Sequence, residues 1–299
     1  MTKKQAWVEA IRPRTLPLSL SGIIFGAAIA FQQLAVNWTI FALAISTTLL
    51  FQILSNLAND YGDGVKGTDN ADRVGPMRAV QSGVISHQTM KSAVIFTAIL
   101  SSISAIALIY FGTQQMPQSV MIMYGVLAIF CVIAAITYTV GKKAYGYHGL
   151  GDVMVFIFFG LVSVLGVYSL FTKTFDWINL LPATTIGLLS VGVLNLNNMR
   201  DYPSDKKAGK NTLVVKIGVD FAKMYHTLVI IIAIVCLVAF LIEKKNAAGF
   251  ISIIPAIGLL FHLMKVAKVR TTKDFDPELK VVALSTFFIA VFYFISIWF

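Results

Sequence analysis

Two clusters of asparagine and aspartate carry the residues of this chain most suited to chemistry, and each follows a long apolar run. They read Asn56-x-x-Asn59-Asp60-x-x-Asp63 and Asn197-Asn198-x-x-Asp201-x-x-x-Asp205. Residues four apart stack on one face of a helix, so Asn197, Asp201 and Asp205 are expected to share a face. The same spacing places Asn56 and Asp60 on one face. Each cluster is therefore expected to present an oxygen-rich surface.

Two such surfaces that face each other form a site for a hard divalent cation. No histidine or cysteine stands beside either cluster, and ligands that are all oxygen favour Mg²⁺ or Ca²⁺. Mg²⁺ typically shares its coordination shell with substrate phosphates. Carboxylates at the edge of a membrane are costly unless a cation or a function requires them. The clusters therefore predict a membrane enzyme that acts on a diphosphate.

The loops after the clusters add residues that suit phosphate binding. After the first cluster, glycines allow the backbone to approach a ligand closely, and Asp69 and Asp72 are placed to support the acids. Arg73 and Arg78 in the same loop are placed to bind phosphate. After the second cluster, Lys206 lies in a similar basic stretch. The alternative for both loops is a solvated turn whose charges only set the membrane topology.

A third basic stretch, between the fourth and fifth apolar runs, contains Lys142 and Lys143 among several tyrosines. The two lysines are candidates to neutralise a diphosphate leaving group, and tyrosine rings can face a developing carbocation. Tyrosines are also common at membrane interfaces without any catalytic role. Asp152, at the start of the fifth run, suits a helix cap better than a metal ligand.

Membrane helices must position these residues. The chain of 299 residues is 57% hydrophobic and 13% charged, with a mean hydropathy of +0.79, which lies outside the range of soluble globular domains. Apolar stretches of roughly 20 residues, the length that crosses a bilayer as a helix, recur nine times. They lie near 15–35, 38–58, 88–111, 119–140, 150–171, 177–199, 221–242, 247–267 and 279–299. The expected fold is an all-α integral membrane protein with a single domain over residues 1–299.

The lysines and arginines indicate how this bundle is oriented. All of them except Lys173, Lys244 and Lys245 fall in the N-terminal segment, in the loops after the second, fourth, sixth and eighth spans, or at the helix ends beside those loops. By the positive-inside tendency, those segments and both clusters face the cytoplasm, and the expected location is the inner (cytoplasmic) membrane. The formal net charge of +10 mostly reflects this topology, with a share for phosphate binding. It does not imply a nucleic-acid partner.

The cysteines and histidines show no spacing typical of a second metal site. Cys131 and Cys236 fall inside apolar spans without a partner at metal-ligand spacing, and we expect them to be packing residues. The four histidines are scattered and form no His-x-x-x-His pair, so no metal role is expected for them.

Three stretches resemble the UbiA superfamily of intramembrane prenyltransferases, and in particular its 1,4-dihydroxy-2-naphthoate polyprenyltransferase branch, which acts in menaquinone biosynthesis. They are Arg12-Pro13-Arg14-Thr15-Leu16-Pro17, then Asn59-Asp60-Tyr61 through Gly67-Thr68-Asp69 and on to Gly83, and Asn198-Met199-Arg200-Asp201 through Gly218. The resemblance covers about residues 10–220. Together the three stretches are much more specific than any single aspartate pair.

The resemblance implies nine helices around a central, lipid-accessible cavity in which two Asp-rich helix ends hold Mg²⁺ against an isoprenyl diphosphate. Carried over by position, the catalytic and metal-binding acids are Asp60, Asp63, Asp201 and Asp205. The expected substrate-binding residues are Asn56, Asn59, Asp69, Arg73, Lys142, Lys143, Asn197 and Lys206. Gly64 departs from the pattern because strict four-residue spacing requires an acid there. Lys142-Lys143-Ala144 interrupts a region that commonly carries prolines in the family.

The resemblance also implies a reaction. A polyprenyl chain passes from polyprenyl diphosphate to 1,4-dihydroxy-2-naphthoate with loss of the carboxylate, giving demethylmenaquinone, in an Mg²⁺-dependent step within the membrane lipid. Alternatives in the superfamily are other aromatic acceptors such as 4-hydroxybenzoate. A secondary transporter, a different class of protein, also combines repeated halves with acidic residues in the membrane. In this chain the acids lie at helix ends and not at mid-span, which favours the enzyme.

Overall fold

The computed structural model describes residues 1–68, 75 and 77–299. In this part of the chain every regular element is a helix, and nine segments are long and apolar enough to cross a membrane. They are Lys3–Phe31, Trp38–Lys66, His87–Gly112, Gln118–Thr137, Gly151–Thr172, Trp177–Arg200, Val219–Lys244, Ala248–Lys268 and Thr272–Ser296. The all-α membrane fold and the nine predicted spans are confirmed.

The first five spans contain helices α1 to α7. Their bounds are α1 Lys3–Ile11, η1 Pro13–Thr15, α2 Leu16–Phe31, α3 Trp38–Lys66, α4 His87–Gly112, α5 Gln118–Thr137, η2 Tyr145–His148, α6 Gly151–Val155, η3 Phe156–Gly166 and α7 Val167–Thr172. The side chain of Asn37 caps the start of α3, and Gly67 ends it in the left-handed conformation that glycine adopts without strain. α3 therefore runs about two turns beyond the predicted span and carries the whole first cluster.

The remaining spans and the loop between the sixth and seventh contain η4 Trp177–Asn179, α8 Leu180–Arg200, α9 Tyr202–Lys207, α10 Leu213–Ile217, α11 Val219–Lys244, η5 Ala248–Ser252, α12 Ile253–Lys268, η6 Thr272–Phe275 and α13 Asp276–Ser296; of these, α9 and α10 lie in the loop. The expectation that Asn197, Asp201 and Asp205 share the face of one helix holds for the first two, since the amide of Asp201 donates to the carbonyl of Asn197 at 3.0 Å, and is wrong for Asp205. Asp201 is the C-cap of α8, and Asp205 lies in the separate helix α9. Pro203 explains the break, because proline lacks an amide hydrogen and its ring clashes with the preceding turn.

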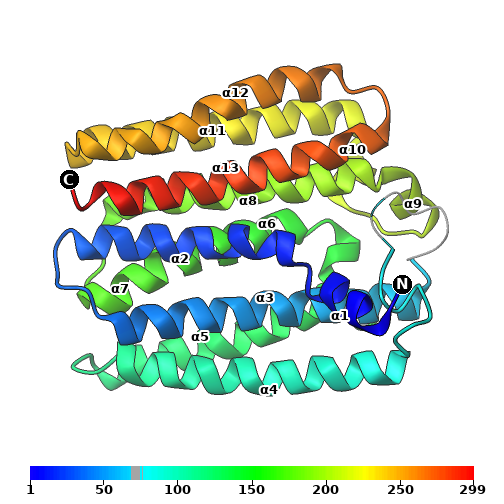
Figure 1. Ribbon diagram of the computed structural model, residues 1–299, viewed down its shortest axis with the longest axis horizontal. Helices are drawn as coiled ribbons and strands as arrows, with labels where there is room; N and C mark the ends of the chain where they lie inside the picture. Colours follow the sequence, from blue (N-terminus) through cyan, green and yellow to red (C-terminus); the bar gives the residue numbers. More distant parts are fainter. Residues whose placement is uncertain (69–74, 76) are drawn as a thin grey trace.

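The helices lie side by side along one direction, as Figure 1 shows. α2 packs against α3, η3 and α13, and α8 packs against α11, η3 and α13. The N-terminus and α9 lie at one end of the bundle, and the C-terminus lies at the opposite end (Figure 1). The end of α3 and the end of α8, which carry the two clusters, therefore meet at the end that also holds the N-terminus.

Small residues bring η3 close to its neighbours. A Cβ atom added to Gly160 would lie 2.5 Å from the carbonyl oxygen of Ala183 and 2.8 Å from the Cα of Gly187, both on α8. Gly22 of α2 has equally little room against Ser163. Close backbone approach of this kind stabilises helix packing in membranes. η3 is also a π-helix, which the hydropathy pattern does not predict, and π segments frequently occur at functional sites.

Three buried polar side chains, one from each helix, connect α11, α12 and α13. Nε2 of His226 lies 2.8 Å from Nε2 of His262, and Nδ1 of His262 lies 2.5 Å from Oε2 of Glu278. Interhelical hydrogen bonds of this type connect spans within a bilayer. These residues are far apart in the sequence, so only helix packing brings them together.

Candidate active site

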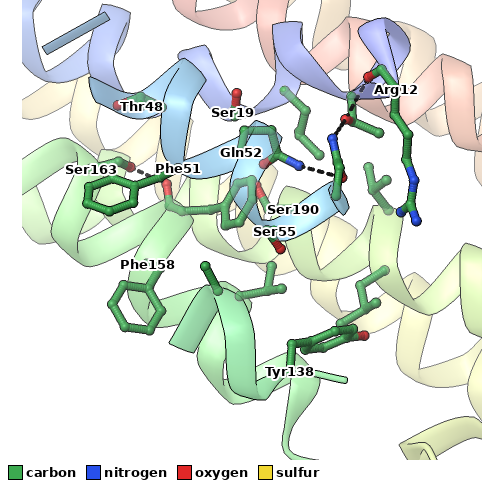
Figure 2. A pocket seen from close by; sticks show the side chains of 18 of the residues that line it. Arg12, Ser19, Thr48, Phe51, Gln52, Ser55, Tyr138, Phe158, Ser163 and Ser190 are labelled. Atoms are coloured by element: carbon green, nitrogen blue, oxygen red, sulfur yellow. Dashed lines mark hydrogen bonds between the residues drawn. The ribbon is translucent and has the colours of Figure 1, made fainter. Parts of the chain in front are cut away.

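A cavity of about 640 Å³ lies inside the bundle, and α2, α3, α5, η3, α8 and α13 all contribute to its wall. Its apolar wall includes Leu18, Ile23, Leu127, Phe158, Val162 and Leu170. Its polar wall includes Asn56, Asn59, Asp63, Arg78, Asn197 and Lys210. Figure 2 shows Arg12 and Tyr138 on one side of this pocket and Phe51 and Ser163 on the other. The cavity therefore joins a charged region to a long apolar one.

Asp63 is the acid of the first cluster that lines this cavity. Only 2% of the residue is exposed. Its Oδ1 accepts a hydrogen bond of 2.7 Å from the hydroxyl of Tyr147, and its Oδ2 lies 3.6 Å from Nη2 of Arg78. Burial raises the pKa of Tyr147, and the charge of Asp63 raises it further, so the hydroxyl keeps its proton and donates it in this bond.

Lys210 connects the two clusters. Its Nζ lies 3.7 Å from Oδ2 of Asp63 and 3.9 Å from Oδ1 of Asp205. Burial lowers the pKa of Lys210, but the two carboxylates outweigh burial and raise the pKa above its usual range. Gly209, with φ of 68°, makes the turn that brings Lys210 back over α9. A buried and charged ammonium group therefore stands between acids from α3 and α9.

Asp60 is not part of the cavity wall and holds a loop. Its Oδ2 accepts a hydrogen bond of 3.1 Å from the amide of Ala79, and its Oδ1 accepts one of 3.2 Å from the amide of Val80. Its side chain does not line the cavity. In this structure Asp60 therefore anchors the segment that carries Arg78, one of the cations beside Asp63.

Asp201 is paired with its neighbour Arg200. Both carboxylate oxygens accept hydrogen bonds of 2.8 Å from this guanidinium, which also donates to Asn197 at 2.8 Å and to Asp276 at 2.6 Å. Bidentate pairs of arginine and carboxylate are among the stronger charged contacts in proteins. Arg200 thereby connects the end of α8 to the start of α13 at the cavity wall.

The predicted asparagines all line the cavity. The amide nitrogen of Asn56 donates to the carbonyl of Ile11 at 2.8 Å and to the hydroxyl of Thr15 at 3.1 Å. Oδ1 of Asn59 accepts from the hydroxyl of Thr139 at 3.2 Å. These contacts tie α3 to the turn before α2 and to the segment after α5.

The predicted lysines lie elsewhere. Lys142, Lys143 and Lys206 are exposed and do not line the cavity. Asp69 and Arg73 lie outside the described residues. The assignment of Asp69 and Arg73 to substrate binding stays a prediction. Lys210 is not among the site residues predicted from the sequence. The sequence does contain a signal for it, the glycine directly before it, which allows the turn that buries the lysine.

Two tyrosine rings form part of the wall beside these charges. The ring centroids of Tyr138 and Tyr145 lie 5.3 Å apart in an edge-to-face arrangement, and both residues line the cavity. Burial raises the pKa of Tyr138 to about 12, so its hydroxyl is neutral at physiological pH. Neutral aromatic rings present a negative π face to a cation.

The donor set suits Mg²⁺. Asp63 and Asp205 supply only oxygen atoms, and hard cations such as Mg²⁺ prefer oxygen ligands. Within residues 1–68, 75 and 77–299, no group of three or more His, Cys, Asp or Glu side chains is already arranged around a metal position. Mg²⁺ commonly takes part of its shell from substrate phosphates, so the carboxylates present fit a metal that arrives with a diphosphate.

The fold and the site define a class of protein: a helical membrane protein with an internal cavity whose wall is charged in one part and apolar in the rest. The chain belongs to the UbiA prenyltransferase family, which matches residues 19–289. The family expected from the three sequence stretches is thereby confirmed.

Several relatives are similar over most of the chain. The 1,4-dihydroxy-2-naphthoate octaprenyltransferase of Escherichia coli (strain K12) is 47% identical over 240 residues, which cover 80% of this chain and 77% of that protein. Proteins of the same name from Haemophilus influenzae and Mycobacterium tuberculosis are 43% and 35% identical, over 80% and 82% of this chain and 77% and 82% of their own lengths.

Solved structures share the fold. A UbiA homolog from Aeropyrum pernix K1 is 14% identical with a TM-score of 0.68, over 95% of this chain and 96% of that one. A UbiA homolog from Archaeoglobus fulgidus, bound to DMAPP and Mg²⁺, is 16% identical with a TM-score of 0.64, over 98% of this chain and 99% of that one. This likeness establishes the arrangement of the nine spans.

Proposed function

We propose that this enzyme transfers a polyprenyl chain from polyprenyl diphosphate to 1,4-dihydroxy-2-naphthoate, with loss of the carboxylate as CO₂ and of diphosphate, to give demethylmenaquinone in its reduced, quinol form. The observation that carries the proposal is the 47% identity to a 1,4-dihydroxy-2-naphthoate octaprenyltransferase over 80% of the chain. The cavity agrees with it, because buried charges at one part of the wall suit a diphosphate and the apolar remainder suits an isoprenoid.

In this proposal the donor's diphosphate lies beside Asp63, Arg78 and Lys210. The aspartates would hold Mg²⁺, which when bound would supply positive charge to the leaving diphosphate. Asp60 and Asp201 belong to the same proposed metal set, because they stand in the two acidic clusters that Lys210 brings together at the end of the bundle. Arg78 and Lys210 supply further positive charge from the protein itself.

The allylic C–O bond breaks and its electron pair leaves with the diphosphate. Charged groups that are already in place stabilise this negative charge without the cost of reorganising solvent. The carbocation left on the prenyl chain faces the rings of Tyr138 and Tyr145, whose π faces attract a cation. The electron-rich aromatic ring then forms the new C–C bond, and the carboxylate departs as CO₂.

Reconstitution of the purified protein tests this proposal. The protein in lipid is incubated with 1,4-dihydroxy-2-naphthoate, a polyprenyl diphosphate and Mg²⁺, and prenylated naphthoquinol is followed by mass spectrometry. Product is expected with Mg²⁺ and is expected to disappear when EDTA removes the metal. Prenylation of 4-hydroxybenzoate without any naphthoate product would refute the proposed acceptor and keep the prenyltransferase. Inactivity with every acceptor would refute the proposed function as a whole.

A further inference from the structure

The turn between α1 and α2 has an unusual backbone at the cavity wall. Arg12 is the C-cap of α1 and has φ 54° and ψ 67°, in the left-handed region. A residue with a side chain pays a steric cost there and keeps this conformation only when its surroundings fix it. Such residues cluster at sites of binding and catalysis. The contacts that fix Arg12 are therefore informative about its role.

Asn56 and Thr15 fix this turn. The amide nitrogen of Asn56 donates to the carbonyl of Ile11 and to the hydroxyl of Thr15, and Gln52 donates to the amide oxygen of Asn56 at 3.1 Å. The hydroxyl of Thr15 donates to the carbonyl of Arg12 at 2.9 Å. Both ends of the Asn56 amide are thus used by the protein. This use favours a role in positioning the turn over a direct role in binding a metal.

The turn aims the side chain of Arg12 into the cavity. Figure 2 shows this side chain running from the turn into the pocket, and Arg12 and Asn56 are both part of the wall. Asn56 precedes Asp63 by seven residues on α3, which corresponds to about 10 Å along the helix axis. The turn is therefore anchored deeper in the bundle than Asp63, which separates it from the cations beside that acid.

We propose that the guanidinium of Arg12 binds the carboxylate of the aromatic acceptor, and that Asn56 and Thr15 are positioning residues for it. The inference rests on the proposed function for a carboxylate-bearing acceptor. A guanidinium recognises oxyanions in general through paired hydrogen bonds, so the donor's diphosphate is the other possible source of the anion. The depth of the Asn56 anchor and the separate cations beside Asp63 assign Arg12 to the acceptor.

Equilibrium dialysis with a matched pair of probes tests this assignment without requiring turnover. The probes are 1-hydroxy-2-naphthoate and 1-naphthol, which differ by the carboxylate. The intact protein is expected to bind the carboxylate probe about 10- to 100-fold more tightly, the usual range for a hydrogen bond to a charged group. Arg12→Gln is expected to remove most of this preference and leave 1-naphthol binding unchanged. Arg270→Gln, an exposed arginine outside the cavity wall, is the control for net charge and is expected to keep the preference.

Variants of Thr15 test whether this residue acts by positioning Arg12. Thr15→Val removes the hydroxyl that holds the turn and is expected to lower the carboxylate preference, whereas Thr15→Ser keeps the hydroxyl and is expected to keep the preference. Adding Thr15→Val to Arg12→Gln is expected to cause no further loss, because both changes act through one guanidinium. A further loss in the double variant would overturn the positioning role.

Other outcomes are also decisive. If Arg12→Gln keeps the carboxylate preference and instead raises the KM for polyprenyl diphosphate, the guanidinium serves the donor and the assignment is overturned. If the intact protein shows the preference for the carboxylate probe but prenylates no dihydroxynaphthoate, the proposed function fails while the carboxylate site stands. If dihydroxynaphthoate is prenylated but no preference exists, the inference fails alone.

Discussion

Lys210 carries the charge that allows two buried carboxylates to approach each other. Asp63 and Asp205 come from segments about 140 residues apart, and each lies within 4 Å of the Lys210 ammonium group. Because these carboxylates raise the pKa of Lys210, its contribution to stability is complete below the ordinary lysine pKa of about 10.4 and is lost only as the pH rises above that value. Any change of stability with pH near neutrality must therefore come from other groups.

Lys210→Gln leaves the two acids without their shared cation. We expect the free energy of unfolding to fall by about 3 kcal/mol or more in EDTA, since breaking a buried ion pair leaves uncompensated charge. Added Mg²⁺ is expected to recover part of the loss, because it replaces positive charge between the acids. Thermal unfolding in detergent at several Mg²⁺ concentrations measures both effects. Turnover is expected to fall at least about tenfold, since the leaving diphosphate loses a preorganised cation.

Lys206→Gln is the matched control. Lys206 is exposed, and its Nζ lies 5.7 Å from the centroid of the Tyr202 ring. The variant has the same change of net charge in the same loop, so unfolding and turnover are expected to stay close to those of the intact protein. Equal losses in both variants would mean that the loop's total charge matters, and not the position of Lys210.

The π-helix η3 is the element that shapes the apolar part of the site. Phe158 and Val162 from this segment line the cavity, while Gly160 on the same segment contacts α8. A π-helix forms its hydrogen bonds over five residues where an α-helix spans four, and such segments frequently occur at functional sites. Close packing of glycines against α8 therefore sets the position of the cavity wall as well as the stability of the bundle.

Gly160→Ala tests this coupling. The added methyl group meets the backbone of Ala183 and Gly187, so η3 must move, and overpacking typically costs about 1–3 kcal/mol. We expect a lower midpoint of thermal unfolding together with a higher KM for the polyprenyl donor. Gly125→Ala is the control, because a Cβ at Gly125 meets no atom within 4 Å. An unchanged KM for the donor in Gly160→Ala would contradict the prediction, because it would show that the packing of η3 against α8 does not affect the substrate site.

The bundle as a whole collects the N-terminus, both aspartate clusters and most basic loops at one end (Figure 1). An odd number of spans places the C-terminus at the other end, as Figure 1 shows. We propose that the first of these ends faces the cytoplasm, because lysine and arginine accumulate on that side of a membrane. A water-soluble acceptor and a released diphosphate would then meet the aqueous phase there.

Cysteine labelling tests the orientation. In a background with Cys131→Ala and Cys236→Ala, a single cysteine is introduced as Lys268→Cys in one variant and as Thr174→Cys in another. Both positions are exposed and lie at opposite ends of the bundle. A membrane-impermeant maleimide is expected to label position 174 in intact spheroplasts and position 268 only in inverted vesicles. The reverse pattern would refute the proposed orientation.

Local properties of the sequence were sufficient to predict the nine spans and the general chemistry of the site. Each span is a run of apolar residues long enough to cross a bilayer, and lipid leaves the backbone no alternative to helix. All nine spans are present among the described residues. Asp63, Asn56, Asn59 and Asn197, which were named from the sequence, lie at the cavity wall, and their roles there stay predictions.

Contacts between distant segments decided the rest. Pro203 turns the chain out of α8 and moves Asp205 into a separate helix. The amides of Ala79 and Val80 bind the carboxylate of Asp60, which does not line the cavity, and a glycine turn places Lys210, and not Lys206, as the buried cation. The direction of a charged side chain depends on which partners lie near it after folding. Charge is strongly favoured only where a counter-charge or hydrogen bonds replace water, and those partners come from helices remote in the sequence.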